Sequence, residues 1–323
     1  MQRLRALKVA LVVPIYNPKY PIGGVNRWAC ELVPRLKDLG LDVDVITVAR
    51  RMRWIGTSIG IASASFKLLK SKYDVVHAGN FRAALPAIMA KRNYVLTVHD
   101  LGPQRLYRFR ARLQVKAIEK ADLITTPTRA IAEQLVNRLN VEEEKIHVVH
   151  NGVDTQKFRP LKVEKPSTPI VAYVGRMAKY KASIFPHIVE ELRRRKVSFE
   201  VRVSGGLSDD ELVRFYNMAS VVVVPTMIEE GEGFSFVTAE ALSCQVPVVV
   251  SDIPAIREVA GPYALYARPG DVKDFADKIE AILKNPDLID LKAARKRIEN
   301  MFSWRQCAEK MLEMYKLLKE GIR

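Results

Sequence analysis

Residues 221–250 read VVVVPTMIEEGEGFSFVTAEALSCQVPVVV. Two apolar runs typical of buried strands bracket an acidic loop with two glycines and a short segment of helical character. A loop that leaves the carboxyl end of a buried strand and enters a helix presents backbone N–H groups and the positive end of the helix dipole. This order of elements therefore predicts a phosphate-binding turn.

Two glutamates flank that turn. Glu232 lies on the glycine loop, and Glu240 follows after seven intervening residues, inside the expected helix. They are expected on either side of the N–H cluster, so that one reaches a sugar beyond the phosphates and the other meets a ribose. Glutamate is common, and the same spacing also fits a solvated acidic loop followed by a helix-facing glutamate.

Length and composition favour a two-domain globular protein. The 323 residues are enough for two buried cores, and 48% of them are hydrophobic and 27% charged. No apolar run approaches the roughly 20 residues that a membrane helix needs. The start, MQRLRALKVALVVPIY, superficially resembles a signal peptide, but we interpret it as a first buried strand leading into a glycine loop. The three cysteines have no metal-like spacing, and we expect reduced thiols of a cytoplasmic protein.

The positive charge is concentrated in the first half of the chain. Residues 1–160 hold 27 Lys and Arg against 13 Asp and Glu, whereas the remainder holds 25 against 23. A one-sided basic surface suggests nucleic acid or an anionic membrane as a partner. Residues 50–55 and 105–116 interleave cations with bulky apolar groups, which favours a membrane surface, although a solvated helix face fits them as well.

Short apolar runs alternate with helical segments along both halves, which predicts βαβ units and parallel sheets. In the first half we expect strands at 8–15, 42–48, 74–77, 94–100, 121–125 and 145–150. In the second half we expect strands at 170–174, 199–204, 221–224, 246–250 and 263–267. Helices are expected at 25–39, 54–70, 129–139, 182–196, 209–218, 271–283 and 287–301, with a last helix through 319.

Three further positions follow strand ends, where open α/β sheets bind ligands. Gly23 and Gly24 form a strand-to-helix turn that a ligand can approach closely. His99 closes the fourth strand, next to Asp100. Arg176 and Lys181 follow the strand at 170–174, where fixed cations can neutralise a departing diphosphate. Each also fits a bland interpretation, as a plain turn, a structural histidine or surface cations.

Taken together, these motifs resemble retaining glycosyltransferases of family 4 with the GT-B fold. Residues 232–242 resemble the family's E-x7-E signature, and Gly23-Gly24, His99-Asp100, Asn151-Gly152-Val153-Asp154 and the Gly175 to Lys181 segment resemble its other motifs in family order. This chain departs from the family at Ala182 and Ser235, where glycine is usual, and it is shorter between Lys181 and Val221. The short segment puts the contacts to the donor base in doubt.

The resemblance implies two Rossmann-like domains facing across a cleft: 1–155 for the acceptor and 170–302 for the nucleotide sugar, joined by a linker at 156–169. Residues 303–323 would be a helix crossing back to the first domain. The resemblance further assigns catalytic roles to His99, Arg176, Lys181 and Glu232. It assigns donor binding to Gly23, Gly24, Gly233, Phe234, Ser235, Phe236, Val237, Thr238 and Glu240.

The implied reaction moves a hexose from a UDP- or GDP-linked sugar to a lipid-linked or glycan acceptor, with retention of configuration and no obligatory metal. We expect a cytoplasmic enzyme, with an anionic membrane face as a candidate partner of the basic domain, and no nucleic acid. The alternatives are a non-catalytic nucleotide-sugar or polyanion binder, a GT-B sugar phosphorylase and, third, a nucleic-acid-binding protein that uses the basic half.

Overall fold

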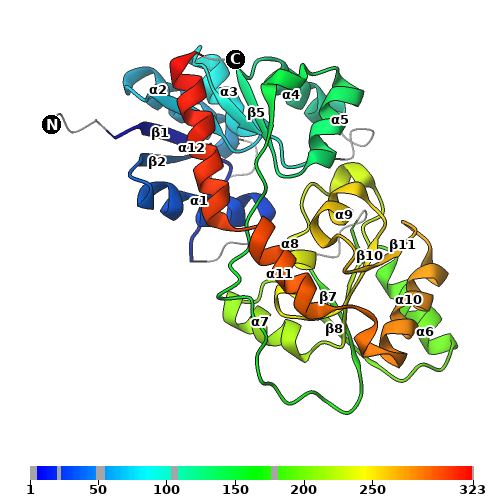
Figure 1. Ribbon diagram of the computed structural model, residues 1–323. Helices are drawn as coiled ribbons and strands as arrows, with labels where there is room; N and C mark the ends of the chain where they lie inside the picture. Colours follow the sequence, from blue (N-terminus) through cyan, green and yellow to red (C-terminus); the bar gives the residue numbers. More distant parts are fainter. Residues whose placement is uncertain (1–5, 20–22, 49–54, 103–107, 176–180, 322–323) are drawn as a thin grey trace. The chain divides into compact units, whose positions relative to one another are not determined.

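The computed structural model describes residues 6–19, 23–48, 55–102, 108–175 and 181–321, and it divides the chain into two compact units (Figure 1). The first unit comprises residues 1–152 and 304–323, and the second comprises 153–303. The chain therefore passes between the units twice. Gly152 lies at one crossing, where a Cβ atom would come within 2.2 Å of the Trp304 backbone nitrogen.

The first unit is built on a six-stranded, fully parallel sheet in the order β2-β1-β3-β4-β5-β6. Its strands are β1 (Lys8–Val13), β2 (Asp42–Thr47), β3 (Val75–Ala78), β4 (Val95–Thr97), β5 (Leu123–Thr126) and β6 (Ile146–Val148). The strands β1, β3, β4 and β5 are almost entirely buried, as expected for a sheet covered on both faces.

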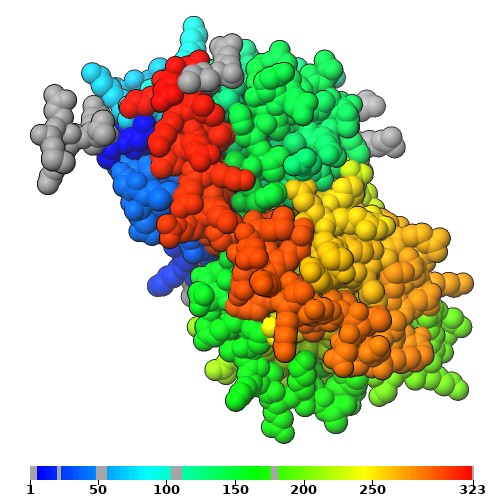
Figure 2. Space-filling model, in the orientation of Figure 1, coloured from blue at the N-terminus to red at the C-terminus, as the bar shows by residue number. Residues whose placement is uncertain are grey.

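Helices cover both faces of this sheet. Their bounds are α1 (Gly24–Asp38), α2 (Ile55–Lys70), α3 (Phe81–Met89), α4 (Arg108–Glu119), α5 (Arg129–Leu139) and α12 (Trp304–Glu320), with a 3-10 turn η2 (Glu143–Lys145). Helices α2, α3 and α4 pack side by side, whereas α12 packs on α1 and on β3 and β4. In Figure 2 the red α12 lies on the outer surface of this unit.

The second unit has a five-stranded parallel sheet in the order β11-β10-β9-β7-β8. Its strands are β7 (Ile170–Val174), β8 (Glu200–Ser204), β9 (Val221–Val224), β10 (Val248–Ser251) and β11 (Leu265–Ala267). Its helices are α6 (Phe185–Arg194), α7 (Asp209–Met218), α8 (Phe236–Ser243), α9 (Pro254–Ala260), α10 (Val272–Lys284) and α11 (Leu291–Met301), with 3-10 turns η3 (Glu229–Gly231) and η4 (Pro286–Leu288). Helices α6 and α10 share one buried cluster, and α7, α8, α9 and α11 share another.

The expectation of two parallel α/β domains is confirmed, with differences in detail. The expected helix at 287–301 is instead η4 followed by α11, because the Asp290 carboxylate accepts a hydrogen bond from the Ala293 N–H and caps a new helix start. The helix expected from Ala182 begins at Phe185 and has proline in its first turn. In the expected linker, Phe158 is buried in the core of the second unit.

Candidate functional site

The strand order of the second sheet reverses at its first strand, β7, which lies between β8 and β9. Chain segments leaving the carboxyl ends of β7 and β9 therefore diverge to opposite sides, and the crevice at such a switch point is where open α/β sheets bind ligands. The segment after β7 contains Lys181, and the segment after β9 contains Glu232. Arg176, the other cation expected here, lies outside the described residues.

Lys181 and Glu232 join these two segments through an ion pair. The Lys181 Nζ atom lies 3.2 Å from Glu232 Oε2, and the Thr226 hydroxyl lies 3.4 Å from the same oxygen. The glutamate side chain is 9% exposed and that of the lysine 38%. The Glu232 carboxylate is thus largely buried, whereas the Lys181 ammonium group that binds it remains accessible to solvent or to an anion. Thr226 was missed by the sequence reasoning, although it closely follows the β9 strand.

The glycine loop enters α8 as the sequence predicted. Ser235 is the N-cap residue, and its hydroxyl accepts a hydrogen bond from the Thr238 N–H at 3.3 Å and lies 2.7 Å from the Thr238 hydroxyl. Phe234 is buried, with its ring against Phe236 and Phe302. Ser235, one of the two residues that depart from the family pattern, therefore stabilises the helix start, and Phe234 anchors the loop.

Glu240 lies inside α8 and is only 3% exposed. The Tyr216 hydroxyl, from α7, donates to Glu240 Oε2 at 2.8 Å, and the tyrosine is itself fully buried. The carboxylate also contributes to raising the pKa of the neighbouring Cys244 thiol to about 12, although burial is the larger cause. Tyr216 was missed by the sequence reasoning because a tyrosine on another helix carries no local signal.

Of the other expected donor-binding residues, Gly233 and Thr238 are buried, and Val237 is half-buried in the first turn of α8. The structure thus brings together residues 232–240 at one loop and helix start, with Lys181 beside them.

In the first unit, the strand order reverses at β1, which lies between β2 and β3. The segment after β1 leads to Gly23, whose φ of 88° is a left-handed conformation that favours glycine. Gly24 is the first residue of α1. The Asn26 side-chain oxygen accepts a hydrogen bond from the Asn17 N–H at 3.0 Å, which braces this loop.

His99 follows β4 at the same edge of the sheet. Its ring packs edge-on against Trp28, with centroids 4.9 Å apart, and its Nε2 atom is buried without a hydrogen-bond partner among the described residues. Burial lowers the pKa of His99 to about 4, and a hydrogen bond with the Gly79 backbone opposes that shift. Gly79 has no room for a side chain, because a Cβ atom would lie 2.9 Å from the Trp28 ring.

A fully buried histidine, His77, connects this region to the C-terminal helix. His77 Nδ1 lies 2.8 Å from the Tyr315 hydroxyl of α12, and Nε2 lies 2.7 Å from the Thr97 hydroxyl, which in turn contacts Thr125 at 2.7 Å. The Trp28 ring also packs edge-on against His77, at 5.3 Å. Burial lowers the pKa of His77 to about 3, so the imidazole is neutral. The proximity of Trp28 to both histidines was not predicted.

Two features, a metal-binding cluster and a membrane-spanning helix, are absent from the described parts of the chain. No group of three or more His, Cys, Asp or Glu side chains there could hold a metal ion. No helix there is long and apolar enough to cross a membrane.

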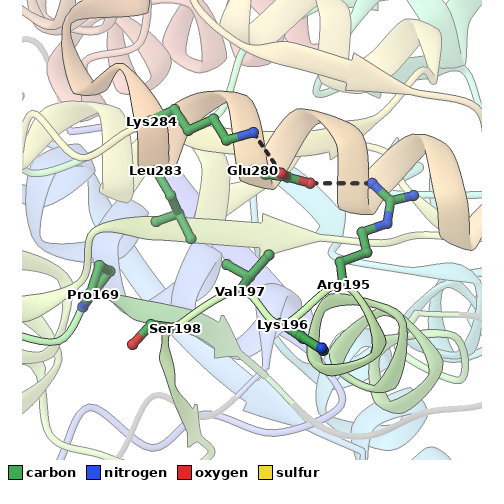
Figure 3. Close-up of a pocket in the computed structure, with 8 residues that line it drawn as sticks. All are labelled: Pro169, Arg195, Lys196, Val197, Ser198, Glu280, Leu283 and Lys284. Carbon is green, nitrogen blue, oxygen red and sulfur yellow. Dashed lines mark hydrogen bonds and ion pairs between the residues drawn. The ribbon is translucent and has the colours of Figure 1, made fainter.

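A separate hollow lies at the amino-terminal edge of the second sheet (Figure 3). It is lined by Pro169, Arg195, Lys196, Val197, Ser198, Glu280, Leu283 and Lys284. Arg195 and Lys284 both bind Glu280, and α6 and α10 end here, where helix dipoles disfavour anions. Unlike the start of α8, this hollow has helix C-termini and no helix N-terminus among its lining residues.

Known families match both halves of the chain. Residues 22–157 match Glycosyltransferase Family 4, and residues 188–304 match Glycosyl transferases group 1. With two parallel-sheet α/β units, these matches define an enzyme that transfers sugars and has the GT-B fold. The chain belongs to the group 1 family of glycosyltransferases.

Curated relatives of the chain act on different sugars. The O-antigen chain mannosyltransferase RfbU of Salmonella typhimurium is 29% identical over 61% of this chain and 63% of its own length. The alpha-maltose-1-phosphate synthase of Mycolicibacterium smegmatis is 24% identical over 96% of this chain and 99% of its own length. These names support glycosyl transfer, and they differ in sugar and acceptor.

Solved structures share the fold at low sequence identity. Sucrose-phosphate synthase from Thermosynechococcus elongatus matches with a TM-score of 0.83 and 19% identity over 97% of this chain and 99% of that chain. Anabaena HepE, solved in complex with UDP-glucose, matches with a TM-score of 0.72 and 16% identity over 96% and 99%. The predicted GT-B architecture is therefore confirmed.

Proposed function

We propose that this enzyme transfers a hexose from a nucleotide-diphosphate sugar to a lipid-linked or glycan acceptor, with retention of anomeric configuration. The observation that carries the proposal is the Lys181–Glu232 ion pair at the switch point of the second sheet, beside the start of α8. The site combines an accessible cation, a carboxylate bound by that cation and a helix N-terminus. The cation and the helix N-terminus suit the negative diphosphate of a nucleotide sugar, and the carboxylate suits its hydroxyl groups.

In this proposal Lys181 and the N–H groups at the start of α8 stabilise the negative charge that develops on the departing diphosphate. Arg176, placed by sequence alone, adds a second cation. With this positive potential, the reaction has no obligatory need for a metal. Glu232 orients the donor sugar, and Glu240, held by the Tyr216 hydroxyl, binds the ribose hydroxyls.

We assign no described side chain as a nucleophile that would form a covalent bond to the sugar. We therefore propose front-face transfer, in which the acceptor attacks directly. The bond between the anomeric carbon and the diphosphate oxygen breaks, and the acceptor oxygen forms its bond on the same face. The departing diphosphate oxygen takes the acceptor hydroxyl proton. Atoms and charge then balance without an enzyme-bound intermediate.

For the first unit, we propose that His99 accepts a hydrogen bond from a hydroxyl of a sugar substrate. The hydrogen bond with the Gly79 backbone raises the pKa of His99, as expected when Nδ1–H donates to a carbonyl oxygen. In the neutral ring, the buried Nε2 atom then carries a lone pair and needs a donor. Gly23 and Gly24 give a ligand close access to the backbone.

The donor is proposed to be a UDP- or GDP-sugar. HepE was solved with UDP-glucose, and RfbU is named a mannosyltransferase. These relatives support a nucleotide sugar as the donor class and leave both bases as candidates.

The test is a thermal-shift screen of UDP- and GDP-linked hexoses, because a bound donor raises the melting temperature by mass action. The stabilising donor is then assayed for release of nucleoside diphosphate, with and without EDTA, and the product's anomeric proton coupling is read by NMR. We expect one donor class to stabilise the protein and to turn over without phosphate. Stabilisation with no turnover would favour a non-catalytic binder, and turnover that requires inorganic phosphate would favour a phosphorylase.

Lys181→Ala and Glu232→Gln are each expected to lower kcat/KM about 100-fold, the effect of removing one charge-stabilising group from an active site. Glu230→Gln is the matched control, two residues away on the same loop, and should retain normal activity. Wild-type turnover in both site variants would contradict the proposed roles.

A further inference from the structure

The outer face of α2 carries a stripe of exposed apolar side chains. Ile59, Phe66 and Leu69 are 50%, 57% and 63% exposed, and with the exposed Ala62 they recur at the three- and four-residue spacing of one helix face. Met89, from the adjacent α3, is 60% exposed, and its sulfur lies 3.7 Å from the Ser65 hydroxyl, which places it against α2. We call these four large residues, Ile59, Phe66, Leu69 and Met89, the α2 patch.

The opposite face of α2 is also apolar and is already buried. Ala64 and Leu68 belong to the core of the first unit, and a Cβ atom on Gly60 would lie 2.1 Å from the Val48 carbonyl oxygen. A helix that covers a sheet normally presents charged and polar residues outward. Because α2 also carries a stripe of large apolar side chains on its outward face, that stripe has the character of a binding surface.

Lysines flank the patch. Lys70 Nζ lies 4.4 Å from the centre of the Phe66 ring, so its stem runs along the aromatic side chain. Lys67, whose Nζ lies 3.3 Å from Asp44, is 44% exposed, and Lys72 and Lys91 are exposed nearby in the chain. Helices α2 and α3 contain no acidic residue.

The sequence around the α2 patch is also positively charged. Residues 45–99 contain nine Lys and Arg but a single acid, Asp74. An apolar stripe rimmed by lysines matches a surface that is apolar inside and anionic at its boundary. A second copy of the chain docked on this face would instead bring lysines against lysines.

We propose that the α2 patch docks the enzyme on an anionic lipid bilayer, with Phe66 and Leu69 entering the acyl boundary and Lys67 and Lys70 at the headgroups. Figure 1 shows α2 beside α3 at the outer edge of the first unit. The segments first expected to bind membrane differ from this patch: residues 50–54 and 105–107 lie outside the described residues, and Leu113 and Val115 of α4 are half-buried.

The test is co-sedimentation of the full-length protein with large unilamellar vesicles, made of phosphatidylcholine alone or of equal parts phosphatidylcholine and phosphatidylglycerol. We expect binding to the anionic vesicles only, weakened by 0.5 M salt. The double variant Phe66→Ser/Leu69→Ser should bind at least tenfold more weakly, and Lys67→Gln/Lys70→Gln should also bind more weakly.

Leu288→Ser/Met301→Ser is the matched control, because these apolar residues of the second unit are 48% and 38% exposed. Binding of Phe66→Ser/Leu69→Ser equal to that of the wild type would overturn the proposal. So would concentration-dependent dimerisation that this variant abolishes, measured by analytical ultracentrifugation, since the occupant would then be a second copy. No donor is present in these assays, so their outcome is independent of the proposed transfer reaction.

Discussion

At the scale of single residues, the signature glutamates differ in what surrounds them. Glu232 faces a lysine that solvent can reach, whereas Glu240 is enclosed and bound by Tyr216. The sequence predicted the position of both, because a loop and a helix follow β9 in order. It did not predict the two partners, since Lys181 lies 51 residues from Glu232 and Tyr216 lies 24 from Glu240. Only the folded sheet brings these pairs together.

Tyr216→Phe keeps the ring but removes the hydroxyl that donates to Glu240. A hydrogen bond to a charged group contributes about 1.5–3 kcal/mol, so we expect the free energy of unfolding to fall by about that amount. Donor affinity should fall as well, because the ribose carboxylate loses its support. Urea unfolding and calorimetric titration with the donor measure the two effects.

Tyr263→Phe is the control, at a half-buried tyrosine in the same unit. If Tyr216→Phe matched this control in both stability and donor affinity, the assigned role of the Tyr216 hydroxyl would be wrong.

At the scale of elements, the predicted bounds of helices and strands were most accurate where a capping residue in the sequence marks the start of a helix. Helices α5 and α7 begin at Arg129 and Asp209, as predicted, directly after the capping residues Thr128 and Ser208. The predicted strand at 94–100 is shorter, at Val95–Thr97. The Val98 N–H still donates to the Thr125 carbonyl oxygen of β5, but His99 and Asp100 lie beyond that last bond, so the predicted strand was too long at its carboxyl end.

Tyr315→Phe in α12 tests how this helix is held. The variant leaves His77 Nδ1 buried without its hydroxyl partner, and we expect a loss of about 1–3 kcal/mol in the free energy of unfolding. Because Trp28 contacts both His77 and His99, the NMR signal of the His99 ring should shift as well.

Lys316→Ala, at an exposed position beside Tyr315 on α12, is the control and should change neither quantity. A stability loss without any change at His99 would mean that His77 and His99 are structurally independent.

At the scale of the whole molecule, two neutral histidines, the buried His77 and the half-buried His99, make stability depend on pH. The pKa of His99 is lowered to about 4 and that of His77 to about 3, both chiefly by burial, from 6.5 in an unfolded chain. At pH values between the folded-state pKa of each histidine and 6.5, the unfolded chain therefore binds more protons than the folded protein does. The stabilisation is complete above pH 6.5 and is lost as the pH falls toward 4.

Between pH 7.5 and 5.0 we expect His99 alone to lower the free energy of unfolding by about 2 kcal/mol. Urea unfolding at both pH values measures it, and His99→Gln should reduce the difference. His187→Gln, at an exposed histidine, is the control and should keep the full difference. An unchanged pH dependence in His99→Gln would show that His99 is not held neutral.

In the proposed reaction, Lys181 binds the donor diphosphate while Glu232 acts on the sugar. Calorimetric titration of the matching nucleoside diphosphate tests these roles most directly, because the ion pair predicts opposite effects. Lys181→Ala should weaken binding at least tenfold, since the cation is lost. Glu232→Gln should bind as tightly as the wild type or more tightly, because it removes the negative charge that pairs with Lys181. Equal weakening in both variants, or weakening in neither, would show that Lys181 and Glu232 do not have these separate roles.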